Sequence, residues 1–186
     1  MIYIVLITIA VVLILYRLMV VVINLSRQTR DVRRSLEDIG VQFYQRAKAF
    51  DRIIDIAESY VDPDQIRHLR KAMAGCARID EDSTSDDILR QERIASQMKE
   101  AFSLIGRRNP DLRSNNAYTE AMAVIDTCER KIRTSSQIYN YNVARLNRDS
   151  SRPAGKVFAG IMGIHRRGYL GSEPVSYKRK MEPAFR

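Results

Sequence analysis

The first 23 residues are the feature that most constrains how this chain can fold. From Met1 to Ile23 every residue is apolar, Thr or Tyr, except Arg17. At 1.5 Å per residue, a helix from Ile2 to Ile23 would be about 33 Å long, enough to cross a hydrocarbon core of roughly 30 Å. The run therefore predicts a transmembrane anchor over residues 1–24.

A cleaved signal peptide is the alternative interpretation of the same run. It would need a basic segment ahead of a shorter apolar stretch and a small-residue cleavage site behind it. No Lys or Arg precedes this run, and it ends as VVINLS, without an A-x-A pattern. The sequence favours an uncleaved anchor, with Arg17 near enough to its end to extend toward the membrane surface.

Basic residues directly after the anchor predict its orientation. Four of them are candidate lipid-facing residues: Arg27, Arg30, Arg33 and Arg34. Because positive flanks stay in the cytoplasm, we expect a short outer N-terminus and a cytoplasmic C-terminal body. The two cysteines, Cys76 and Cys128, then lie in a reducing compartment, where buried free thiols are the default.

The net charge of +9 is unevenly distributed. Residues 17–34 contribute +4, residues 35–151 contribute −1, and residues 152–186 contribute +6. A nucleic-acid-binding protein would place its basic residues on the folded body, so we expect no nucleic-acid partner. A topology signal plus a solvated tail explains the pattern, and attraction to anionic lipid is a reasonable addition.

Apolar residues recur at spacings of three and four over four later segments, which predicts amphipathic helices. These segments are residues 25–60, 63–79, 86–107 and 115–148. No Pro or Gly occurs between the anchor and Gly40, so the first of them can continue the membrane helix. Asp62-Pro63 and Asn109-Pro110 mark turns, and Thr84 or Ser85 is a suitable helix cap after an acidic loop.

Short links between four helices predict an all-α fold, an up-and-down antiparallel four-helix bundle over residues 25–150. Residues 151–186 contain Pro153 and several glycines, which predict a basic, mostly irregular tail. Within this tail the apolar stretch at 157–164 could pack on the bundle or touch the membrane.

Patterns typical of catalytic or metal sites are missing from the sequence. Neither His68 nor His165 has a second ligand three or four residues away, and metal sites need several converging donors. The acidic loop DEDSTSDD lacks the Gly and terminal Glu of a calcium-binding EF-hand. No glycine-rich phosphate loop or nucleophile elbow occurs. We therefore expect no enzyme activity and no cofactor.

Polar residues inside the helical seams are the candidate functional residues. If the first and fourth helices are antiparallel, facing residue numbers add up to about 176. That register predicts an Arg46–Glu129 ion pair, Gln42 near Ser135, and Asn142 near Arg34 or Ser35. The alternative is that Arg46 and Glu129 both point to solvent. The complete candidate seam is Gln42, Arg46, Glu129, Ser135, Tyr139, Asn140 and Asn142.

Several of these residues belong to stretches that resemble the LemA family of bacterial membrane proteins. The first is Ile39-Gly-Val-Gln-Phe-Tyr-Gln-Arg, continuing to Ile53-Ile54 and Tyr60. The others are Asn109-Pro-Asp-Leu-Arg-Ser-Asn, Glu129-x-Lys131-Ile132, Tyr139-Asn140 with Val143 and Asn147, and Phe158-Ala-Gly-Ile-Met-Gly. The chain departs from the family pattern at two places. It has Lys48-Ala49-Phe50-Asp51 where the family usually has Asp-Leu-Ile-Pro, and Leu146-Asn147 where the family usually has Tyr-Asn.

The resemblance implies a single-pass protein of the bacterial inner membrane with a cytoplasmic helical bundle and no established reaction. It also hints at membrane-protein quality control. The leading hypothesis is a non-catalytic interaction or scaffold module with protein partners. The alternative is a lipid-surface or membrane-remodelling factor that uses the basic juxtamembrane segment and tail.

Overall fold

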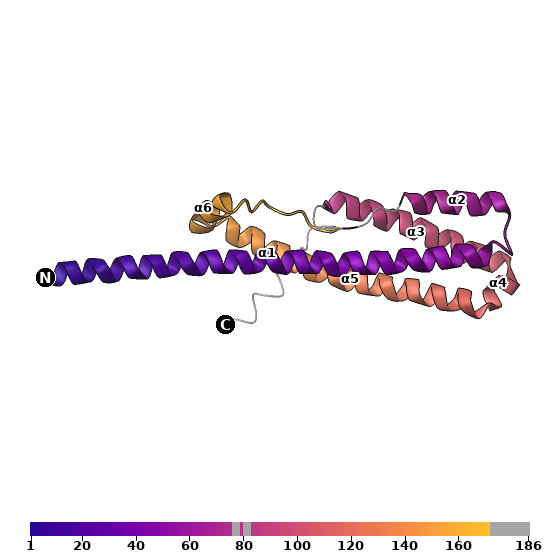
Figure 1. Cartoon of the computed structure of the whole chain (residues 1–186), viewed down its shortest axis with the longest axis horizontal. Coiled ribbons are helices and arrows are strands. Elements are labelled where there is room, and N and C mark those ends of the chain that lie inside the picture. The colour runs from indigo at the N-terminus through magenta and orange to yellow at the C-terminus, as the bar shows by residue number, and fades with distance from the viewer. Residues whose placement is uncertain (76–78, 80–82, 172–186) are drawn as a thin grey trace. The chain divides into compact units, whose positions relative to one another are not determined.

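A computed structural model describes residues 1–75, 79 and 83–171, and every regular element in these ranges is an α-helix (Figure 1). The helices are α1 (Ile2–Ala57), α2 (Pro63–Ala74), α3 (Ser85–Arg108), α4 (Pro110–Ser114), α5 (Asn116–Ser150) and α6 (Pro153–Ile161). The predicted all-α class is confirmed. The predictions for Cys76, for residues 80–82 of the acidic loop and for residues 172–186 of the tail lie outside the described residues.

The described residues form two compact units. The anchor unit contains residues 1–34 and 139–169, and the core unit contains residues 35–138 and 170–171. Helices α1 and α5 each contribute to both units, because each continues without a break past the point of division.

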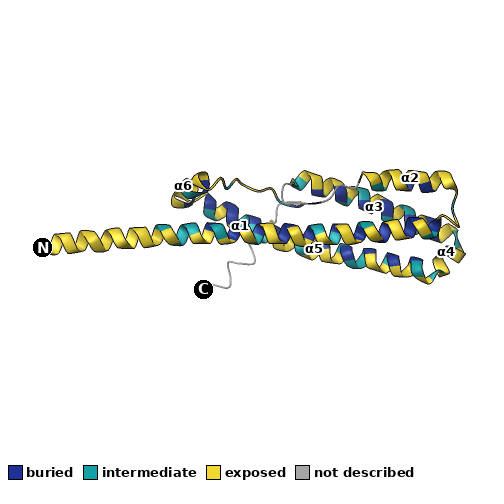
Figure 2. Ribbon diagram, viewed as in Figure 1, coloured by how far each residue is buried: buried dark blue, intermediate teal, exposed yellow. Residues whose placement is uncertain are grey.

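Helix α1 is a single helix of 56 residues that begins with the apolar run. Residues 2–17 of this helix are all exposed, and the yellow N-terminal part of α1 in Figure 2 shows this. Its most apolar 18-residue window has a mean hydropathy of 2.9, with none of its residues buried. The helix is therefore long and apolar enough to span a membrane, as the sequence predicted.

The core unit is organised around apolar side chains from five helices. Phe50 of α1 and Phe102 of α3 are almost fully buried, and their rings stack with centroids 5.6 Å apart. Ile54, Leu69 of α2, Leu112 of α4 and Ile125 of α5 belong to the same cluster. The apolar seam predicted from the three-four spacing thus forms the core.

The helix caps follow the sequence signals. Asp62 accepts a hydrogen bond from the main-chain N–H of Asp64 and starts α2 with Pro63 in its first turn. Thr84 and Asp87 form a reciprocal capping box at the start of α3. Thr84, one of the two predicted caps, is therefore the one used. The short helix α4 was not predicted, since only a turn was expected at Asn109-Pro110.

The structure of the segment after α5 partly corrects the prediction of a mostly irregular tail. Residues 153–161 form α6 despite two glycines, with Pro153 in the first turn. Gly155 is buried against α5, where a Cβ would clash with the main-chain oxygen of Asp149. The glycine therefore permits close packing here. Residues 162–171 are irregular, as expected.

Candidate functional site

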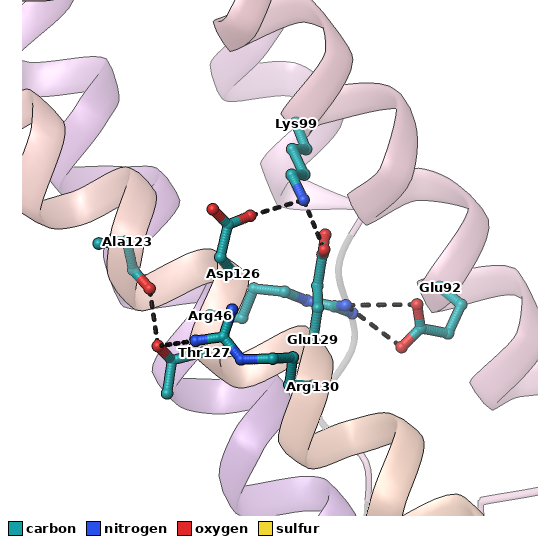
Figure 3. A network of polar contacts seen from close by, with 8 residues as sticks. All are labelled: Arg46, Glu92, Lys99, Ala123, Asp126, Thr127, Glu129 and Arg130. Atoms are coloured by element: carbon teal, nitrogen blue, oxygen red, sulfur yellow. Dashed lines mark hydrogen bonds and ion pairs between the residues drawn. The ribbon is translucent and has the colours of Figure 1, made fainter.

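The core unit holds a buried arginine. Arg46 extends from α1, and only 3% of its side chain is exposed. Its Nη1 lies 3.2 and 3.3 Å from the two carboxylate oxygens of Glu92 on α3 (Figure 3). The guanidinium also lies 4.5 Å from the centre of the Phe43 ring. Because a guanidinium is rarely buried without a counter-charge, Glu92 is the group that allows Arg46 to be buried.

A second charged cluster lies beside the first. The ammonium of Lys99 on α3 is 2.7 Å from Asp126 and 2.6 Å from Glu129, both on α5 (Figure 3). Partial burial acts to lower the pKa of Lys99, but hydrogen bonds and charges from the two carboxylates outweigh it and raise the pKa. The lysine therefore stays a cation and joins α3 to α5.

The predicted Arg46–Glu129 ion pair is wrong. Arg46 pairs with Glu92, and Glu129 pairs with Lys99. The register argument compared only the first and fourth helices, whereas α3 provides one partner to each of them. The alternative that both side chains point to solvent is also wrong, because Arg46 is buried and Glu129 is half-buried. Gln42 and Ser135 are half-buried, and the buried Oε1 of Gln42 has no hydrogen-bond partner among the described residues.

In the anchor unit the seam residues of α5 hold the chain that returns after α6. Asn147 is buried, donates to the main-chain oxygen of Arg167 at 2.9 Å and accepts from its N–H at 3.1 Å. The hydroxyl of Tyr139 donates to the main-chain oxygen of Gly168. Asn140 is buried as well. Tyr139 and Asn147 therefore have a structural role in holding the returning chain.

Contacts between α1 and α5 within the anchor unit are antiparallel, as predicted. Asn142 donates to the main-chain oxygen of Asp31 at 3.3 Å, about one helical turn from the predicted Arg34 or Ser35. Gln28, which is buried, donates to the carboxylate of Asp149 at 2.7 Å. Sequence reasoning missed the Gln28–Asp149 contact, although the same register count would have paired these two residues.

The surroundings of Asp149 predict that the anchor unit loses stability in acid. Partial burial acts to raise its pKa, but hydrogen bonds from Gln28 and Arg148, with the charges of Arg148 and Arg152, hold the pKa below its ordinary value of 3.8. A lowered folded-state pKa stabilises the fold above pH 3.8, and this stabilisation is lost as the pH falls through the folded-state pKa. Asp149→Asn should therefore remove part of the loss of thermal stability that the wild type shows below about pH 4.

This prediction is checked by circular dichroism melts of both proteins in detergent between about pH 2 and 6. Asp111→Asn, an exposed carboxylate of α4, is the matched control and should leave the pH profile of the melting temperature unchanged. Parallel profiles for wild type and Asp149→Asn would contradict the assignment.

A shallow groove of about 280 Å³ runs between α3 and α5 in the core unit. Its lining combines apolar side chains with two carboxylates, Glu92 and Glu129, that belong to the clusters above. The lining residues are Ile88, Leu89, Glu92, Ser96, Glu129, Ile132, Arg133, Ser136, Leu170 and Gly171. Within the described ranges no three His, Cys, Asp or Glu side chains come together in a way that could hold a metal ion. Cys128 is a buried free thiol whose pKa is raised by that burial.

Comparison with known proteins supports the resemblance noted above. The sequence model of the LemA family matches residues 35–184. The match includes the whole described core unit and the α6 region of the anchor unit, and it begins after the apolar run. A comparison with curated proteins found no match.

Proposed function

Because the chain belongs to the LemA family, we propose that it is a non-catalytic, membrane-anchored interaction module that binds protein partners at the inner face of a bacterial cell membrane. The proposal has three parts: how the chain is anchored, how its body is built, and which surface binds.

The first part is a single-pass anchor formed by the N-terminal half of α1. Its apolar run is followed by Arg27, Arg30, Arg33 and Arg34, all exposed or half-exposed on α1. Such a basic flank favours a cytoplasmic body and a short N-terminus outside.

The second part is a cytoplasmic body in the form of an up-and-down four-helix bundle made of the core-unit parts of α1, α2, α3 and α5. Its charged interior supports a structural role for these residues. Arg46 and Lys99 are each held by carboxylates, an arrangement that fixes helix register and leaves the cations poorly suited to act on a substrate.

The third part, the binding surface, rests on one observation, the groove between α3 and α5. Leu89 is 37% exposed at its rim, with Ile88 and Ile132 beneath, and Glu92 and Glu129 lie alongside. Both carboxylates are already paired, with Arg46 and Lys99, and Arg133 also lines the groove, so the surface left for recognition is the apolar floor. We therefore propose an amphipathic helix of another protein, docked by its apolar stripe, as the class of partner.

Site-specific photocrosslinking in intact cells tests the proposal. A benzophenone side chain placed at Leu89, or separately at Ser136, should give the same partner adduct, because both positions line the groove. The control is Val124 on α5, which is 40% exposed and does not line the groove. Adducts from Leu89 and Ser136 no stronger than those from Val124 would reject the groove as the binding surface.

A second candidate function is a lipid-surface or membrane-remodelling factor, with a link to membrane-protein quality control. The exposed apolar side chains of α6, beside the basic juxtamembrane segment, favour it. If the basic segment and tail drive lipid binding, replacing their basic residues should abolish binding of the cytoplasmic part to anionic vesicles. Unchanged binding to those vesicles would reject this candidate.

A further inference from the structure

We infer that α6 is an interfacial helix whose exposed apolar face lies in the headgroup–acyl boundary of the same bilayer that α1 spans. This inference rests on the proposed membrane anchoring and is independent of the proposed protein-binding groove. It concerns only the anchor unit, to which α6, the apolar part of α1 and the end of α5 all belong.

The contacts of α5 place α6 at the end of the anchor unit that carries the apolar run. As α5 proceeds from Asn142 to Asp149, its partner on α1 changes from Asp31 to Gln28. After α6 the chain turns back, because Arg167 pairs with Asn147 and Gly168 with Tyr139, earlier on α5. Helix α6 therefore lies where the chain reverses direction, beyond Gln28 toward the apolar run of α1.

Burial along α1 locates the same end independently. Residues 1–17 are exposed, partial burial begins at Leu18, and Leu25 is almost fully buried. The packed part of the anchor unit thus overlaps the last turns of the apolar run, which ends at Ile23. In a bilayer centred on the run, these turns lie at the boundary between acyl chains and headgroups.

The surface chemistry of α6 matches that depth. Gly155 and Ala159 form its buried side, whereas Val157 and Ile161, four residues apart on the other side, are 61% and 74% exposed. Met162, at the helix end, extends the exposed apolar face. Large exposed apolar side chains on one face are typical of helices that lie in the plane of a membrane surface.

Basic residues around this face identify the bilayer, and not a soluble protein, as its partner. Lys156 on α6 and Arg166 in the segment that follows are exposed, and Arg27 and Arg30 are exposed on α1 in the same unit. Interfacial helices combine an apolar face with such cations because the headgroup region of anionic lipids is negative. The inferred partner is therefore the anionic bilayer that contains α1.

Single tryptophan probes can test this inference, because the chain contains no Trp. The full-length variant Ile161→Trp is reconstituted into vesicles of phosphatidylcholine and phosphatidylglycerol, with and without bromine on the acyl chains. We expect a blue-shifted emission and quenching by shallow bromines on the order of threefold stronger than for a solvent-exposed probe, as for an interfacial side chain. Val157→Trp, on the same face, should behave alike and guards against a local effect of one substitution.

Two controls calibrate the measurement. Ile7→Trp lies within the apolar run and should be quenched by deep bromines, whereas Val124→Trp on α5 of the core unit should stay unquenched. If both α6 probes match Val124→Trp while Ile7→Trp is quenched, the inference about α6 is wrong and the anchor stands. If Ile7→Trp is unquenched too, the anchoring on which the inference rests is wrong. Neither outcome affects the crosslinking test of the groove.

Discussion

Phe102→Ala should lower the free energy of unfolding by about 3–5 kcal/mol, the range found for truncating a fully buried aromatic side chain. Phe102 has no exposed surface and stacks on Phe50, so its removal leaves a cavity between α1 and α3. Denaturant unfolding of the full chain in mild detergent, followed by helical circular dichroism, measures the loss. Because a domain is stable by only about 5–15 kcal/mol, this variant should be close to unfolding in cells.

Leu104→Ala is the matched control on the same helix. Leu104 is 39% exposed, so its truncation leaves no enclosed cavity and should change stability by about 0.5 kcal/mol. Equal losses for the two variants would mean that α3 does not pack as described. The contrast matters for function, since α3 also carries Glu92 and Lys99 and forms one wall of the groove.

The apolar core of the core unit was predictable because a helix has a fixed period. Apolar residues that recur at the three-four spacing on the first helix, such as Ile39, Phe50 and Ile54, have exposures of 0–1%. The spacing identifies which side of a helix is buried, but it does not identify the helix that packs against that side. For that reason the spacing could not predict that Phe50 contacts Phe102.

The charged part of the site was less predictable for a related reason. Arg46 and Glu129 were each correctly expected to lie inside or at the edge of the bundle, but their partners were not. A register count between two antiparallel helices holds for those two alone, and in the anchor unit it would have paired Gln28 with Asp149 had it been applied there. In the core unit α3 also offers partners to Arg46 and Glu129. No local sequence pattern shows which side of α3 faces these two residues.

Helix α6 was not predicted, because the prediction relied on the glycine content of the segment and did not include its packing against α5. Glycine disfavours a helix in isolation, yet Gly155 is the residue that allows α6 to pack against Asp149. The two hydrogen bonds between Asn147 and Arg167 hold the returning chain in place. Both are contacts between residues outside one helix, which helix propensity does not include.

Glu92→Ala should destabilise the core unit by about 2–4 kcal/mol, since it leaves the buried Arg46 guanidinium without its carboxylate. The expected loss of stability is smaller than for a fully buried ion pair, because the side chain of Glu92 is 33% exposed and water can replace part of the lost interaction. Unfolding in denaturant, measured as for Phe102→Ala, gives the loss. A change of less than about 0.5 kcal/mol would show that Arg46 is not dependent on Glu92.

An apolar double variant separates the ion pair from the cost of burying it. Arg46→Met with Glu92→Met should recover most of the stability lost in Glu92→Ala, because two apolar side chains need no counter-charge. The matched control is the pair Arg52–Glu120, also between two helices of the core unit but 54% and 65% exposed, whose coupling should be about 0.5 kcal/mol. If the apolar double variant is stable and yet gives no adduct from Leu89, Glu92 serves partner binding in addition to folding. If it is stable and still gives the adduct, the carboxylate serves register alone, and the apolar floor of the groove carries the recognition.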